Sequence, residues 1–125
     1  MDLETYRRLA LSSLDAARGG YRKGVCLYQV GNELHGAILW TMGYWLIKHG
    51  RQPDPAKAHG WVECHFRTLV EPGDRAYPLL ELVELAILHS IDDPEEIMAD
   101  RLPTHKTLGE LLAHAGAVIE RVLGD

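Results

Sequence analysis

The longest apolar stretch of the chain constrains the fold most. From residue 21 to residue 49 there is no proline, and apolar side chains recur every three or four residues in YRKGVCLYQVGNELHGAILWTMGYWLIKHG, residues 21–50. This spacing predicts one long helix that ends at Gly50. At 1.5 Å per residue a helix of about 27 residues would reach about 40 Å, so we expect a kink near one of its glycines.

The middle of this stretch is too short to cross a membrane. Its uncharged part, residues 36–47, spans twelve residues between His35 and Lys48, whereas a bilayer requires about 20. Glycines at positions 31, 36 and 43 each cost about 1 kcal/mol relative to alanine, which predicts that neighbouring helices approach the backbone there. We expect the aromatic residues at 40, 44 and 45 to fill the core rather than to form a cofactor site.

The same periodicity and the usual end signals predict the other helices. They run from about Leu3 to Arg18, ended by Gly19 and Gly20; from about Pro55 to Val70; from Asp74 or Arg75 to about His89; from Asp92 to before Pro103; and from Thr107 through Val122. The helix before His89 is apolar almost all round, so we expect it to be the most buried. Thr107 and Glu110 fit the capping box T-x-x-E.

No segment alternates apolar and polar residues between turns as a strand would, so the sequence predicts an all-α fold. A chain of 125 residues has the usual size of one domain with one core. We therefore expect a single domain over residues 1–125, an up-and-down bundle of four or five main helices.

The charge of the chain is unevenly distributed. Residues 1–70 hold nine Lys/Arg and six Asp/Glu, whereas residues 71–100 hold nine Asp/Glu and only Arg75 as a basic residue. This acidic block disfavours unspecific nucleic-acid binding over the whole surface. If the protein binds RNA, we expect it to do so through a local basic patch, around Arg18, Arg22 and Lys23 or near Lys48 and Arg51.

The two cysteines, Cys26 and Cys64, are interpreted as free thiols that pack as small residues. The first twenty residues lack the pattern of a secretion signal. Both observations favour a cytoplasmic protein.

Two pairs of residues could begin a metal site. His59 and Glu63, and likewise Glu110 and His114, are four residues apart and share a helix face. A zinc centre requires a third ligand, and neither H-E-x-x-H nor paired E-x-x-H motifs occur. We therefore interpret both pairs as solvated, and expect no metal and no cofactor.

Nucleophile and phosphate motifs are also weak. Cys64 and His65 are adjacent, so on a helix they point about 100° apart and cannot form a base–thiol pair. No Walker or Rossmann glycine motif occurs. Arg101 and His105, in RLPTH, are the remaining candidates, because a guanidinium beside an imidazole could bind phosphate and move a proton in metal-independent RNA cleavage.

The order of elements resembles the HEPN superfamily, the prokaryotic and eukaryotic nucleotide-binding helical domain. The resemblance covers most of the chain and rests on YRRLALSSLDAARGG, the long apolar stretch, AKAHGW, and the closing LGELLAHAGAVIERVL. It implies an up-and-down four-helix bundle, commonly a homodimer. Members act as RNase toxins, as partners of small nucleotidyltransferases, or as non-catalytic binding modules.

Nuclease members carry an Arg followed at a short distance by a His. In this chain three residues separate Arg101 from His105, one fewer than the shortest interval in those members, and one of the three is Pro103. The resemblance therefore favours a non-catalytic HEPN-like module, toxin–antitoxin-associated, that binds a nucleotide-bearing ligand or a protein such as a nucleotidyltransferase. The alternatives are a metal-independent RNase that uses Arg101 and His105, and a helical adaptor unrelated to HEPN.

Homodimerisation is also expected from the chain itself. The aromatic-rich stretch offers more apolar surface than one small bundle is expected to cover.

Overall fold

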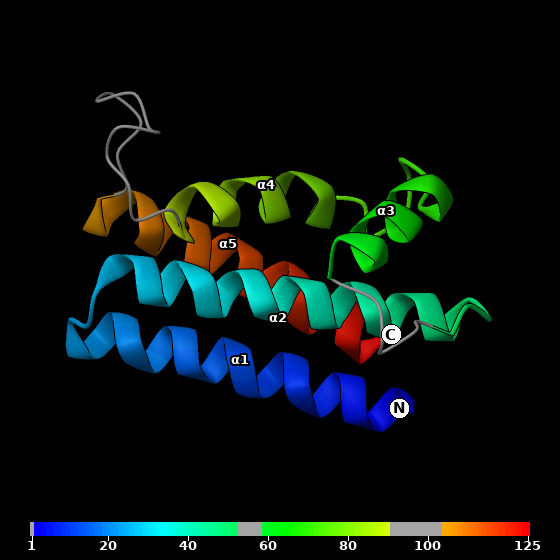
Figure 1. Ribbon diagram of the computed structural model, residues 1–125, viewed down its shortest axis with the longest axis horizontal. Coiled ribbons are helices and arrows are strands. Elements are labelled where there is room, and N and C mark those ends of the chain that lie inside the picture. The colour runs from blue at the N-terminus through cyan, green and yellow to red at the C-terminus, as the bar shows by residue number, and fades with distance from the viewer. Residues whose placement is uncertain (1, 53–58, 91–103) are drawn as a thin grey trace.

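The computed structural model describes residues 2–52, 59–90 and 104–125, and within these ranges every regular element is a helix (Figure 1). The helices are α1 (Leu3–Lys23), α2 (Leu27–Lys48), α3 (His59–Leu69), α4 (Leu79–Ser90) and α5 (His105–Gly124). The prediction of an all-α fold is confirmed. The helix expected between Asp92 and Pro103, and the expected start of α3 at Pro55, lie outside the described residues.

α2 is the central helix and packs against each of the other four. α1 and α4 run antiparallel to α2, while α5 runs parallel to it, and α3 lies near the C-terminal end of α2 (Figure 1). The bundle therefore has two distinct ends. We name them the Tyr21 end, where Tyr21, Gly31, His89 and His105 lie, and the Trp45 end, where Tyr6, Trp45, Asp74 and Leu123 lie.

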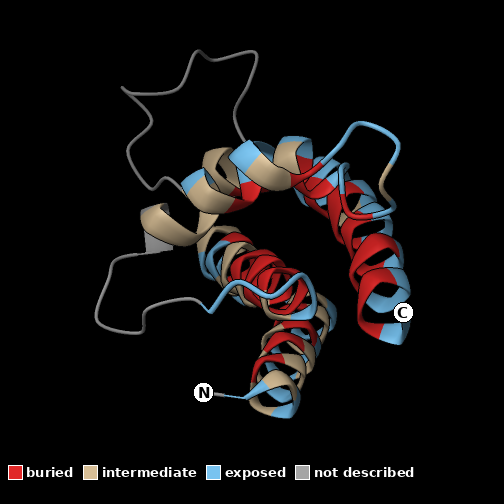
Figure 2. Cartoon of the chain, turned by 90° about the vertical axis from the view of Figure 1, so that its right-hand side faces the viewer, coloured by how far each residue is buried: buried red, intermediate tan, exposed pale blue. Residues whose placement is uncertain are grey.

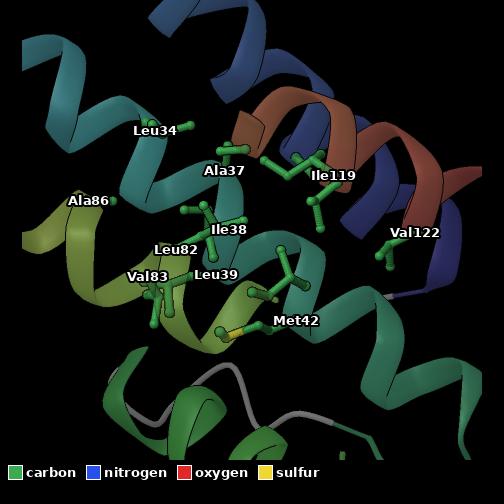
Figure 3. Packing of buried hydrophobic residues seen from close by; sticks show 14 of the residues in the cluster. Leu34, Ala37, Ile38, Leu39, Met42, Leu82, Val83, Ala86, Ile119 and Val122 are labelled. Atoms are coloured by element: carbon green, nitrogen blue, oxygen red, sulfur yellow. The ribbon is translucent and has the colours of Figure 1, made fainter. Parts of the chain in front are cut away.

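The core is built mainly by α2 and α5, and α1 and α4 contribute four buried residues each. Fully buried side chains of α2 such as Leu34, Ile38 and Met42 point toward α4 and α5, where Leu82 and Ile119 meet them (Figure 3). Seen from one end of the bundle, buried residues lie on the sides of the helices that face one another (Figure 2). α2 contributes the most buried residues, so the expectation that the helix before His89 is the most buried is wrong. On α4, Leu85 is exposed and Ile87 and Leu88 are half-buried.

The boundary between α1 and α2 differs from the prediction. Gly19 and Gly20 do not end α1, which continues to Lys23 and ends at Gly24, in the left-handed conformation with φ +73°. The amide of Gly24 bonds to the carbonyl oxygens of Gly20 and Tyr21, as in a glycine C-cap. Residues 21–23 therefore belong to α1, and α2 has 22 residues rather than the expected ~27.

Two of the three α2 glycines meet neighbouring helices, as expected. A Cβ on Gly31 would lie 2.4 Å from the main-chain oxygen of His89, at the end of α4. A Cβ on Gly43 would lie 2.5 Å from the ring of Tyr6, on α1. Gly36 is different, because its nearest neighbour would be Ser13 Oγ at an ordinary 3.9 Å.

The starts of α4 and α5 also differ from the predictions. α4 begins at Leu79, not at Asp74 or Arg75, because Pro78 disfavours helical conformation at the residue before it. α5 begins at His105 with Thr104 as its N-cap, and Thr104 and Thr107 form the reciprocal capping box. The predicted box of Thr107 with Glu110 is wrong, because Thr107 is the third residue of the helix rather than its cap.

Among the residues that the structure describes, no helix is long and apolar enough to cross a membrane.

Candidate functional site

His105, the predicted catalytic base, lies at the Tyr21 end, whereas Arg101 lies outside the described residues. The imidazole stacks on the ring of Tyr21, with centroids 4.2 Å apart and planes 18° apart. The Tyr21 hydroxyl lies 3.1 Å from His105 Nδ1 and donates to the main-chain oxygen of His105 at 2.9 Å. The first residue of α5 is thus fixed against the last turn of α1.

These contacts hold the imidazole of His105 in place. Tyr21 has one hydroxyl proton, and the main-chain oxygen of His105 accepts it. The Tyr21 oxygen can still accept a hydrogen bond from Nδ1 when that nitrogen carries a proton. The side chain of His105 is exposed, so its imidazole is open to solvent.

His89 lies close to the same end of the bundle. Its Nδ1 lies 2.8 Å from the main-chain oxygen of Leu85, one turn earlier in α4. A histidine in the last turn of a helix can bond in this way to one of the last carbonyl oxygens. Its Nε2 lies 3.2 Å from Thr107 Oγ1, in the first turn of α5. His89 therefore joins α4 to α5, and two histidines with one tyrosine hold this end together.

Only one of the two candidate metal pairs, Glu110 with His114, has both side chains described. Glu63 forms an ion pair with Arg67 at 3.1 Å, and the side chain of its expected partner His59 is not among those described. Glu110 and His114 are both exposed, as the solvated interpretation predicts. Over the described ranges no group of three His, Cys, Asp or Glu residues is placed to hold a metal ion.

The interpretation of Cys26 and Cys64 as packing residues is wrong, because both are exposed free thiols. Cys26 occupies the N-cap position of α2, where it makes no side-chain capping bond. Cys64 lies on the outer face of α3, since the inner face is occupied by Phe66. Neither side chain contributes to the core.

The Trp45 end contains a cleft of about 340 Å³. α2, α5 and the turn segment 71–78 before α4 form it. The lining residues are Tyr44, Trp45, Lys48, His49, Asp74, Arg75, Ala76, Val122 and Asp125. None of them was singled out by the sequence as a catalytic or metal-binding residue.

One wall of the cleft is a fixed aromatic group. Trp45 is 6% exposed, its ring stacks on His49 at 3.9 Å, and its edge-to-face partner is Phe66. The indole N–H donates to Asp74 Oδ2 at 3.3 Å, and Asp74 Oδ1 accepts from the amide of Ala76. Tyr44 is equally buried and donates its hydroxyl to the main-chain oxygen of Leu123. The wall is therefore held rigid by three segments.

The rim of the cleft is charged. Arg75 Nη1 lies 3.1 Å from Asp125 Oδ1, and Lys48 Nζ donates to the main-chain oxygen of Asp125. Lys48 Nζ also lies 5.8 Å from the centre of the Tyr44 ring, within the range of a cation–π contact. Cations and aromatic rings thus converge on one concave site.

Sequence reasoning predicted Lys48 only as part of a basic patch and Trp45 only as core. The other lining residues come from positions far apart in the chain, so no spacing could group them. The one available signal was the combination of Trp45, Lys48 and His49 within a single helical turn.

Comparisons with protein-family models, with curated proteins and with solved structures found no match to this chain.

Proposed function

We propose that the protein is a non-catalytic, HEPN-like binding module whose cleft at the Trp45 end takes a small ligand with a planar ring and a negative charge, such as a nucleotide. The cleft carries the proposal. Its volume of about 340 Å³ falls within the range of small-molecule sites, which are mostly apolar with a few polar groups that orient the ligand.

The composition of the cleft supports a ring-bearing anion in particular. Trp45 and Tyr44 are buried and hydrogen-bonded, so little side-chain entropy is lost when a ring packs on their exposed edges. Lys48 and Arg75 supply donors for an oxyanion. The polar groups are engaged in bonds that fix geometry, which suits recognition rather than proton transfer.

The test is calorimetric titration of the protein with AMP. We expect saturable binding that Lys48→Ala weakens by roughly tenfold, since a hydrogen bond to a charged group contributes about 1.5–3 kcal/mol. Lys106→Ala is the matched control, because Lys106 is an exposed lysine at the opposite end of the bundle. If the wild-type protein does not bind AMP, or if both variants weaken binding equally, the proposal is wrong.

The second candidate function is the metal-independent RNase. It is favoured by one observation, the exposed His105 imidazole held in place by Tyr21, because imidazole is the side chain that most often acts as a general base. An RNA-cleavage assay with His105→Ala tests it. Activity that the substitution abolishes supports this candidate, and activity that survives eliminates His105 as the base.

The homodimer and a nucleotidyltransferase or other protein partner stay proposals that rest on the resemblance to HEPN proteins. The aromatic surface of α2 no longer supports a dimer, because Tyr44 and Trp45 are only 5% and 6% exposed within their own chain. Light scattering at high micromolar concentration tests the dimer, and a monomer there would contradict it.

A further inference from the structure

The rim of the cleft contains a charge arrangement that extends the proposed function. Lys48 belongs to the last turn of α2, Arg75 to the turn segment before α4, and Asp125 follows the last residue of α5. Asp125 accepts from both cations, through its carboxylate from Arg75 and through its main-chain oxygen from Lys48. Two cations from different segments therefore converge on one acidic residue of the same chain.

The position of Asp125 is electrostatically unfavourable without these cations. It stands next to the C-terminal end of α5, which is also close to the C-terminal end of α2 (Figure 1). Both ends carry partial negative charge, which disfavours a carboxylate and favours a cation. Lys48 fits this rule as a helix-end cation. Arg75 does not, since it lies outside any helix and bonds to the side chain of Asp125 rather than to a helix carbonyl.

The contact is also easy to replace. The side chains of Arg75 and Asp125 are 67% and 49% exposed, and exposed ion pairs contribute little net stability. An incoming oxyanion that meets both cations would make charge-assisted bonds at least as strong. Displacement of Asp125 would therefore cost the folded protein little.

We infer that Lys48 and Arg75 form the oxyanion subsite of the cleft, and that Asp125 occupies this subsite when no ligand is bound. The inference rests on the proposed function. It assigns the ligand a phosphate or carboxylate group, held by the two cations, attached to a ring that lies against Trp45 and the apolar side chains of Ala76 and Val122. Asp125 is then an internal competitor that lowers affinity for any such ligand.

The experiment compares Asp125→Asn with wild-type protein by calorimetric titration. Three probes share one nucleoside: AMP carries a phosphate, adenosine-5′-carboxylic acid carries a carboxylate, and adenosine carries no charge. We expect Asp125→Asn to bind the charged probes roughly two- to fivefold more tightly, the gain that loss of one exposed competing ion pair allows. Its affinity for adenosine should be unchanged.

Glu120→Gln is the matched control. Glu120 is an exposed acid of α5, the helix that Asp125 follows, and it pairs with Arg18 at 2.6 Å, away from the cleft. Its removal changes the net charge equally, so an equal gain in affinity from Glu120→Gln would show that only the overall charge matters and would overturn the inference. Arg75→Ala should weaken the binding of AMP and leave the affinity for adenosine unchanged.

The outcomes separate the inference from the function on which it rests. AMP binding that is unchanged by Asp125→Asn overturns the inference and leaves the cleft as a binding site. If neither protein binds any of the three probes, the cleft is not such a site, and both fail. A gain for AMP alone supports the subsite with a phosphate ligand, and a gain for the carboxylate alone supports it with a carboxylate ligand.

Discussion

The two ends of the bundle are closed in different ways. At the Tyr21 end, helix backbones and polar side chains meet directly: Gly31 lies against the main chain of His89, and Tyr21 is bonded to His105. At the Trp45 end, buried aromatic rings form a rigid wall, but a cleft of about 340 Å³ is left beside them. Backbone contact leaves no room for a ligand, whereas large rings packed at angles do.

The comparison predicts that substitutions at the Tyr21 end mainly change stability, while those at the rim of the Trp45 end mainly change binding. The following experiments test that division, in order of expected effect.

Gly31→Ala should be the most damaging. Its Cβ would lie 2.4 Å from the His89 oxygen, and backbone cannot move aside cheaply. We expect a loss of about 1–3 kcal/mol in the free energy of unfolding, measured in urea. Gly36→Ala, which meets only ordinary contacts, should be neutral or stabilising by up to about 1 kcal/mol. Equal effects at the two positions would mean that α4 does not press on α2.

Gly43→Ala should cost less than Gly31→Ala. The obstacle is the Tyr6 ring at 2.5 Å, a side chain that can shift where a backbone cannot. We expect a loss of about 1 kcal/mol, at the lower limit for overpacking. The double variant Gly43→Ala with Tyr6→Leu should recover part of that loss, because the shorter side chain makes room. A larger loss for Gly43→Ala than for Gly31→Ala would reverse the proposed difference between the ends.

Tyr21→Phe removes the hydroxyl that binds His105 but keeps the stacked ring. Loss of these hydrogen bonds should lower the free energy of unfolding by about 0.5–1.5 kcal/mol. Tyr28→Phe is the control, since no described residue bonds to the half-buried Tyr28 hydroxyl. Thermal denaturation of the two variants gives the comparison, and equal midpoints would show that the Tyr21–His105 bonds do not stabilise this end.

Tyr6 should make the Trp45 end sensitive to alkali. Burial raises the pKa of Tyr6 above its ordinary value of 10.0. The neutral form is favoured in the folded protein, so this contribution to stability is complete below pH 10 and is lost as the pH rises through the raised pKa. Tyr6→Phe should reduce the fall in the free energy of unfolding above pH 10, and an unchanged profile would contradict this assignment.

Asp2 should give the smallest effect, in acid. Hydrogen bonds from the Thr5 side chain and amide lower the pKa of Asp2 below its ordinary value of 3.8. Its stabilisation of α1 is present above pH 3.8 and is lost as the pH falls through the lowered pKa. Asp2→Asn keeps a capping oxygen and removes the titration. Helicity measured by circular dichroism should then depend less on pH in this range.

The sequence predicted helix type more reliably than helix ends. The three- and four-residue spacing of apolar side chains reports one helix face, and it correctly predicted that the chain is helical where α1 and α2 lie. Helix ends depend on single residues. Gly24 rather than Gly19 ends α1, and α4 begins only after Pro78. Where several glycines or threonines lie close together in the chain, each of them could end or begin the helix, and tertiary contacts decide which one does.

The sequence did not predict most residues of the candidate site. The sequence pointed to His105 because its side chain is chemically active. Its partner Tyr21 is 84 residues away, and the sequence predicted Tyr21 at the start of the long helix that follows α1. The cleft joins Trp45, Arg75 and Asp125, which no motif connects. Only a helix packing that brings these segments together can place them around one space.

The sequence by itself determined that this chain forms amphipathic helices, because periodicity is a local property. It predicted close approaches to α2 at Gly31, Gly36 and Gly43, and the structure shows them at Gly31 and Gly43 only. The tertiary structure decided which ends of the helices meet, and so placed two cations and an acid beside a buried indole. That choice depends on contacts between residues distant in the chain, whose energies no local pattern records.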